Sequence, residues 1–148
     1  MAKTQRSRSS ATKTPTRTAR TRTTAKRGAP KLPKAVATAV RAARDKKAQD
    51  IIVLDLRNAG GFTDYFVICT GNNARQINAI ADSVREILKT ELDERPALTE
   101  GVDRSEWILL DYFNFVVHVF SRECRSFYGL ERLWGNAERH EIADEAHP

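Results

Sequence analysis

The first 30 residues limit what this chain can fold into more than any other feature. They contain nine Lys or Arg residues, no Asp or Glu, and almost no large apolar side chain. Such a segment cannot bury enough apolar surface to offset the entropy that ordering it would cost. We therefore predict a disordered basic tail over residues 1–33, so that any fold must be built from the rest of the chain.

Without residues 1–30 the net charge changes sign. The whole chain of 148 residues carries +6, whereas the remainder has 16 basic residues against 19 acidic ones, a formal charge of −3. A basic tail on an acidic domain suggests two kinds of contact with a partner, and RNA phosphates are a natural target for the tail. Two other interpretations stay open: an organellar transit peptide and a tail that serves only solubility. The candidate phosphate contacts are Arg17, Arg20, Arg22, Lys26 and Arg27.

Length and composition exclude several classes of protein. A chain of 148 residues allows one folded domain, and its apolar runs are far too short to span a membrane. We expect no secretory signal peptide. Two cysteines, Cys69 and Cys124, do not make a disulfide framework, and no further Cys or His stands at metal-ligand spacing to either. We expect reduced thiols, no structural zinc and no cofactor.

Apolar periodicity predicts the order α-β-β-α-β-β-α, with a further short strand near Leu98. Asn73 is placed to cap the longest helix, with Gln76 at the capping-box position, and Ser121 to cap a later one. We expect a domain over residues 34–135 followed by a frayed polar C-terminal tail, 136–148. The fold class is α/β of the mixed α+β kind: a mixed sheet of four or five strands with packed helices. The expected helices are 34–48, 73–88, 122–128 and 130–134, and the expected strands are 51–56, 64–70, 107–112 and 115–120.

Acidic residues at strand ends raise the question of an enzyme. Asp55, Asp64 and Asp111 each lie near a strand end, where three carboxylates could hold Mg²⁺. The element order is compatible with a nucleotidyltransferase-like fold, yet the Asp-x-Asp or Asp-x-Glu pair of such enzymes is missing, since Ser83 and Val84 follow Asp82. The pattern favours a non-enzyme without a metal site. A nucleotidyltransferase-like enzyme and an RNA-binding module driven by the tail remain as alternatives.

The region from residue 106 to 134 has the most specific motifs. The segments Glu106–Tyr112, Val116–Phe120 and Arg125–Trp134, with Asp50–Asp55 and Thr63–Gly71 upstream, resemble the ribosomal silencing factor family, also called Iojap-like. The resemblance covers residues 34–135. One departure lies in the hairpin turn, where the family usually has Gly-Asp and this chain has Phe113-Asn114.

The resemblance implies a non-catalytic function. It implies a nucleotidyltransferase-like fold without an active site, which binds ribosomal protein L fourteen on the large ribosomal subunit. Bound there, such a protein blocks joining of the small subunit and represses translation. The resemblance favours the cytoplasm of a bacterium over an organelle, and it allows a homodimer.

Large aromatic side chains with charged neighbours are the candidate partner contacts. Protein interfaces are anchored by a few such residues, and acidic groups suit a basic ribosomal protein. Helical spacing instead favours a core position for Phe127, Leu130 and Leu133, and a β-strand favours one for His118. The proposed partner-binding residues are Trp107, Asp111, Tyr112, Arg125, Tyr128, Glu131 and Trp134.

Overall fold

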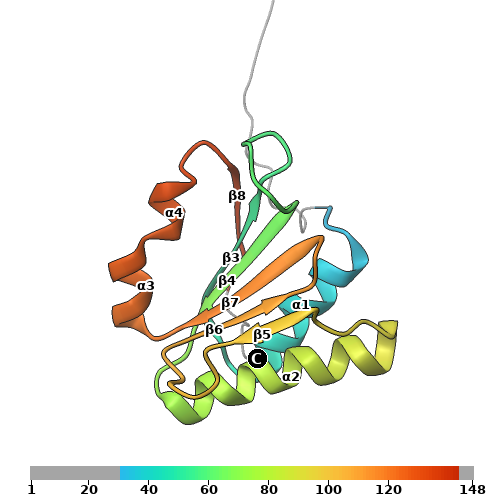
Figure 1. Ribbon diagram of the computed structural model, residues 1–148, viewed down its shortest axis with the longest axis vertical. Helices are drawn as coiled ribbons and strands as arrows, with labels where there is room; N and C mark the ends of the chain where they lie inside the picture. The colour runs from blue at the N-terminus through green and yellow to red at the C-terminus, as the bar shows by residue number, and fades with distance from the viewer. Residues whose placement is uncertain (1–30, 144–148) are drawn as a thin grey trace, which may run out of the picture. The chain divides into compact units, whose positions relative to one another are not determined.

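Six strands form one mixed sheet in the computed structural model, which describes residues 31–143 (Figure 1). The strand order across the sheet is β5-β6-β7-β4-β3-β8. β4 and β7 are parallel, and all other neighbouring strands are antiparallel. No described helix is long and apolar enough to cross a membrane. The strands are β3 (Gln49–Asp55), β4 (Tyr65–Thr70), β5 (Leu98–Glu100), β6 (Trp107–Asp111), β7 (Phe115–Phe120) and β8 (Glu138–Glu141).

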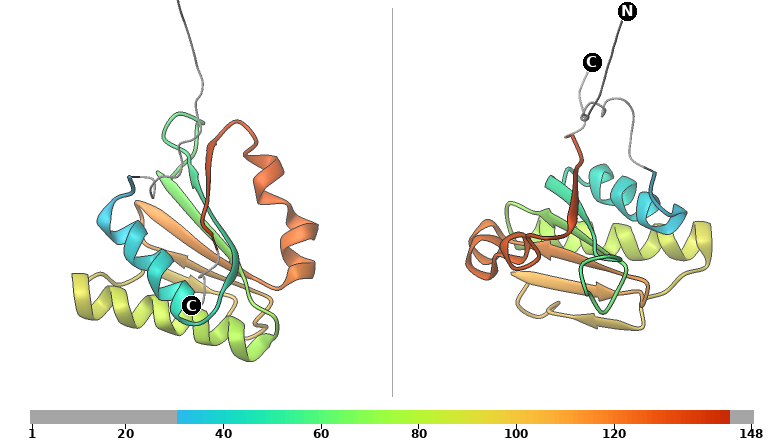
Figure 2. Two further views of the ribbon diagram at one scale, coloured as in Figure 1. Left: turned by 180° about the vertical axis from the view of Figure 1, so that it is seen from behind. Right: turned by 90° about the horizontal axis from the view of Figure 1, so that it is seen from above.

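Two amphipathic helices, α1 (Lys34–Asp45) and α2 (Ala74–Leu92), cover one face of the sheet and enclose the larger core cluster. The view from behind shows α1 in front of the strands (Figure 2, left). The predicted cap of α2 is confirmed: Asn73 Oδ1 accepts a hydrogen bond from Gln76 N at 2.8 Å, and Gln76 Oε1 accepts one from Asn72 N at 2.6 Å. The first bond satisfies a main-chain donor that the first turn of a helix leaves without a partner, and the second ties the residue before the cap to that turn. α1 ends three residues earlier than expected.

The opposite face of the sheet carries a smaller core cluster, which includes Ile52, Phe66 and Phe120. Two short helices, α3 (Arg122–Tyr128) and α4 (Leu130–Leu133), pack there through Cys124, Leu130 and the following Trp134. Ser121 caps α3 as predicted, because its side chain accepts a hydrogen bond from Cys124 N at 3.1 Å. These helices are too short to cover the whole face.

The C-terminal segment is a correction to the expected frayed tail. Residues Glu138–Glu141 form β8, which pairs antiparallel with β3, and Ile142 N donates to Ile51 O at 2.9 Å. The sheet therefore has six strands instead of four or five, and the folded unit continues past residue 135. The segment was missed because β8 is a mostly exposed edge strand held by main-chain bonds, so its sequence has no alternating apolar pattern.

The β6–β7 hairpin turns through Phe113, whose φ is +79°. Asn114 N donates to Tyr112 O at 2.9 Å, a bond that closes a γ-turn, and a γ-turn with positive central φ is strained. Asp111 Oδ1 accepts from Phe113 N at 2.8 Å, and Thr63 Oγ1 donates to Phe113 O at 2.9 Å. The ring of Phe113 is 80% exposed, so these polar bonds hold the turn and the ring does not.

Replacing Phe113 by glycine is expected to stabilise the domain by about 0.5–1 kcal/mol. A left-handed conformation costs an L-residue about 1–2 kcal/mol, which glycine avoids. The greater conformational freedom of glycine in the unfolded state offsets about 0.5–1 kcal/mol of this gain. The exposed ring contributes little packing that could be lost. Urea unfolding would show this as a raised midpoint at unchanged slope. Phe113→Ala, which removes the ring but keeps the strain, should not raise the midpoint; an equal gain would show that the ring was the destabilising feature.

Candidate docking site

An aromatic cluster lies between the open face of the sheet and α3. The half-buried Trp107 ring stacks on Phe120, with centroids 4.9 Å apart, and also packs against Tyr128 in a tilted contact, with centroids 4.6 Å apart. Its indole Nε1–H donates to Nδ1 of His118 at 3.1 Å. Trp107 and Phe120 are cross-strand partners in register, which fixes the ring on this face of the sheet. Trp107 thus joins the sheet to α3 and also reaches the surface.

The outer side of α3 and α4 exposes large apolar side chains. Phe127 is 79% exposed, Leu133 is 71% exposed and Tyr128 is 48% exposed. Phe127 and Tyr128 contact each other edge to face at 5.0 Å. The expected core position is wrong for Phe127 and Leu133, while Leu130 does pack against the smaller core cluster. We call Phe127, Tyr128 and Leu133 the α3–α4 apolar set.

The spacing that suggested a core stripe fails for a local reason. Phe127, Leu130 and Leu133 recur every three residues, but Gly129, with a φ of +56°, ends the helix between Phe127 and Leu130, and α4 itself ends at Leu133. Because α3 ends there and α4 has only four residues, the three side chains do not form one buried stripe: Leu130 packs inward, whereas Phe127 and Leu133 stay exposed. The signal that could have revealed their exposure was Gly129 itself, a typical residue after the last turn of a helix.

Arg125 and Glu131 form an ion pair that belongs to the framework of the site. Arg125 Nε and Nη2 donate to Glu131 Oε2 at 3.0 and 2.8 Å, and the two side chains are only 12% and 19% exposed. Arg125 Nη1 also donates to Asp50 O at 2.6 Å and to Thr70 Oγ1 at 2.8 Å. Through these bonds Arg125 ties α3 and α4 to the start of β3 and the end of β4. Its guanidinium group is therefore largely occupied and offers a partner little surface.

The remaining predicted contact residues have different environments. Tyr112 is only 5% exposed and stacks on Phe115 at 4.8 Å, and burial raises the pKa of its hydroxyl to about 12. It is a core residue and is not available to a partner. Asp111 holds the hairpin turn, and the half-buried Trp134 packs edge-on against Phe66 at 6.1 Å. The predicted residues that reach the surface beside α3 and α4 are therefore Trp107, Tyr128 and Trp134.

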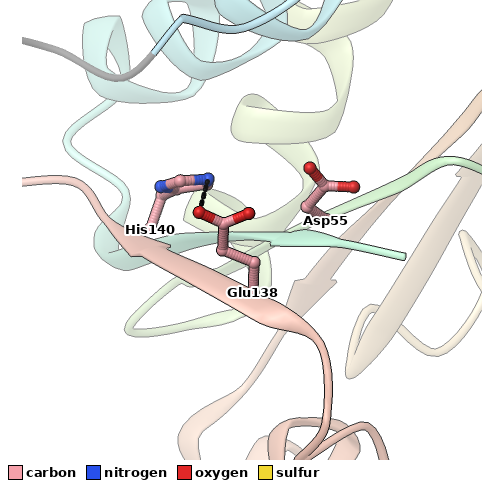
Figure 3. Close-up of side chains that lie close together, drawn as sticks. All are labelled: Asp55, Glu138 and His140. Atoms are coloured by element: carbon pink, nitrogen blue, oxygen red, sulfur yellow. Dashed lines mark ion pairs between the residues drawn. The ribbon is translucent and has the colours of Figure 1, made fainter. Parts of the chain in front are cut away.

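The acidic residues considered for catalysis do not come together. In the described residues the groups at metal-ligand distances are Asp55, Glu138 and His140, on β3 and β8 (Figure 3). Both oxygens of Asp55 accept from Arg57, at 3.0 and 2.7 Å, and these bonds lower the pKa of the carboxyl group. His140 Nε2 lies 4.0 Å from Glu138 Oε2. Arg57 thus already occupies both oxygens of Asp55, and the His140–Glu138 contact lies within β8.

The other carboxylates considered, Asp64 and Asp111, are not in this group at metal-ligand distances. Asp111 is at the hairpin turn, and Asp64 takes part in the same turn region through its main chain, since Asp64 N donates to Asn114 O at 3.1 Å. Asp82 lies on the exposed side of α2, where its Oδ1 is 3.6 Å from Nη2 of Arg85. The candidate phosphate contacts of the tail, residues 17–27, fall outside the described residues.

Comparison with known proteins identifies similar chains. A family model described as "Ribosomal silencing factor during starvation" matches residues 29–148. The chain is 45% identical over 102 residues to Ribosomal silencing factor RsfS of Bacillus subtilis, which covers 67% of this chain and 83% of that protein. A mouse protein named "Mitochondrial assembly of ribosomal large subunit protein 1" is 33% identical over 94 residues, which are 62% of this chain and 41% of the mouse protein.

A solved structure has the same fold. The crystal structure of a protein from Chromobacterium violaceum superposes with a TM-score of 0.67 at 30% sequence identity, covering 80% of this chain and 95% of the other.

Proposed function

The chain belongs to the ribosomal silencing factor family, and we propose that it binds the large ribosomal subunit through ribosomal protein L fourteen and blocks joining of the small subunit. The mechanism is steric occlusion and needs no chemistry. Translation falls because a large subunit with the protein bound cannot form a complete ribosome. Its place of action is the bacterial cytoplasm.

The observation that carries this proposal is the α3–α4 apolar set. Phe127 and Leu133 are each more than 70% exposed, and Tyr128 is half-exposed beside Trp107. Grouped large apolar residues on a surface are typical of protein interfaces, and aromatic residues dominate their binding energy. The formal charge of −3 beyond residue 30 suits a basic ribosomal protein.

The experiment that tests the proposal is co-sedimentation of the full chain with isolated large and small subunits. Light scattering would follow subunit joining in the same samples. We expect binding to large subunits alone and a loss of joining as the protein is added. Full-strength joining at saturating protein, or binding to small subunits only, would contradict the proposal.

The basic tail is expected to add affinity that depends on salt. Nine cations can contact phosphates of ribosomal RNA, and each contact steepens the fall of log K with log salt by roughly 0.7–0.9. Deleting residues 1–30 should weaken binding at low salt, flatten the salt dependence and leave the docking site on the large subunit unchanged. A full-length variant with Gln at Arg17, Arg20, Arg22, Lys26 and Arg27 should flatten it in part. Equal affinity of the full and shortened chains at every salt concentration would rule out this role of the tail.

A further inference from the structure

His118 is the residue whose environment the packing of the core explains least. It lies in the middle of β7, is 3% exposed, and its Nε2 has no hydrogen-bond partner among the described residues. A buried polar group without a partner costs about 1–3 kcal/mol, so a leucine or phenylalanine would fill this position with less loss. What an apolar residue could not supply is the bond to Trp107.

That bond fixes the proton on His118. An indole N–H can only donate, so Nδ1 of His118 must accept and the single proton of the neutral ring lies on Nε2. Burial lowers the pKa of His118 to about 3, which keeps the ring neutral. Nδ1 is thus an acceptor for Trp107 throughout the neutral range.

The acceptor selects one orientation of the Trp107 ring. Trp107 is held by a stacked contact with Phe120 and a tilted contact with Tyr128, which a ring turned over by half a rotation could also make. In the turned ring, however, Nε1 would point away from His118, which would leave the buried Nδ1 of His118 without a donor. The hydrogen bond therefore distinguishes between two packings that apolar contact alone would leave close in energy.

The ring of Trp107 in turn supports α3. Tyr128 lies on Trp107 at 4.6 Å, and Phe127 lies on Tyr128 at 5.0 Å. A chain of contacts consequently runs from the buried His118 through Trp107 to the exposed end of α3. At the buried end of this series of contacts, the Phe66 ring packs edge-on against His118, with ring centroids 4.5 Å apart.

We propose that His118 is a positioning residue of the docking surface: it holds the Trp107 indole in one orientation so that α3 presents its aromatic side chains already arranged for the partner. The inference rests on the proposed docking function. A preformed surface binds more tightly because less side-chain freedom is lost on association, at about 0.5–1.5 kcal/mol for each ordered side chain.

Hydrogen exchange is read in the full chain with Trp134→Phe, so that Trp107 is the one remaining tryptophan, whereas affinity is measured in the full chain with Trp134 in place. His118→Phe keeps the ring volume and removes the acceptor, whereas His118→Asn places an amide oxygen near the position of Nδ1. Two readouts are taken: hydrogen exchange of the Trp107 indole N–H by NMR, and affinity for isolated large subunits. We expect faster exchange and a twofold to tenfold weaker affinity for His118→Phe, and recovery of both by His118→Asn.

The two readouts separate failure of the inference from failure of the proposed function. Unchanged indole exchange in His118→Phe overturns the positioning role whatever the ribosome data show. Faster exchange with unchanged affinity also overturns it, because the orientation would then not matter for docking. Failure of the parent chain to bind large subunits would reject the proposed function and, with it, the docking part of this inference.

A double-mutant cycle distinguishes an effect of His118 through Trp107 from a general loss of folding. With Trp107→Phe already in place, the indole is gone, so adding His118→Phe should cause no further loss of affinity. A further loss of the same size as in the parent chain would show that His118 acts on the domain in general and not through Trp107.

Discussion

Replacing Phe127 and Leu133 together by serine is expected to weaken binding to large ribosomal subunits by at least about 100-fold, since two interface anchors contribute about 2 kcal/mol or more each. The free energy of unfolding of the same double variant should lie within about 0.5 kcal/mol of that of the parent chain, because substitutions at exposed positions rarely change stability by more. Both side chains are more than 70% exposed, so little packing is lost. Co-sedimentation and urea unfolding measure the two effects separately.

The chain offers a matched control for this prediction. Phe113 is 80% exposed, as Phe127 is, but it lies at the β6–β7 turn, whereas α3 follows the other end of β7. Six strand residues separate these ends by roughly 20 Å. Phe113→Ser should therefore leave binding nearly unchanged. A loss as large as that of the double variant would indicate a nonspecific role of exposed apolar surface, and full binding by the double variant would place the docking face elsewhere.

The elements with strong patterns were predictable from the sequence. The buried strands are continuous apolar runs, and the cap at Asn73 marked the start of α2, so the layered arrangement followed from local chemistry. β8 could not be predicted because its pairing with β3 depends on main-chain bonds, which nearly every residue type can make. The order of the six strands could not be predicted either, because it depends on pairing between segments that are far apart in the sequence.

The candidate site was predictable in composition and not in detail. Trp107, Tyr128 and Trp134 were recognised as large aromatic residues near one another, and all three come to the surface beside α3 and α4. Tyr112 was wrongly included because its buried position depends on stacking with Phe115 from the next strand. Phe127 was wrongly assigned to the core because a three-residue spacing does not reveal a helix break.

Arg125 was assigned to the interface by its chemistry, but its geometry predicts a structural effect. Replacing Arg125 by leucine is expected to destabilise the domain by about 2–3 kcal/mol. Breaking a fully buried ion pair costs about 3–5 kcal/mol because the remaining charge loses its partner, and the pair here retains slight exposure, which lowers the cost. Thr70 Oγ1 and Asp50 O would lose their donor at the same time. Urea unfolding of the purified variant measures the loss.

The control compares an exposed ion pair on the same molecule. Arg85 lies 3.6 Å from Asp82, with side chains 41% and 69% exposed, so Arg85→Ala should change stability by less than about 1 kcal/mol. Changing Glu131 to glutamine in the Arg125→Leu chain should then restore part of the lost stability, because it removes the charge left without a partner. If Arg125→Leu costs no more than Arg85→Ala, the pair does not hold α3 and α4 in place. Arg125 would then be free to serve as a direct contact for the partner.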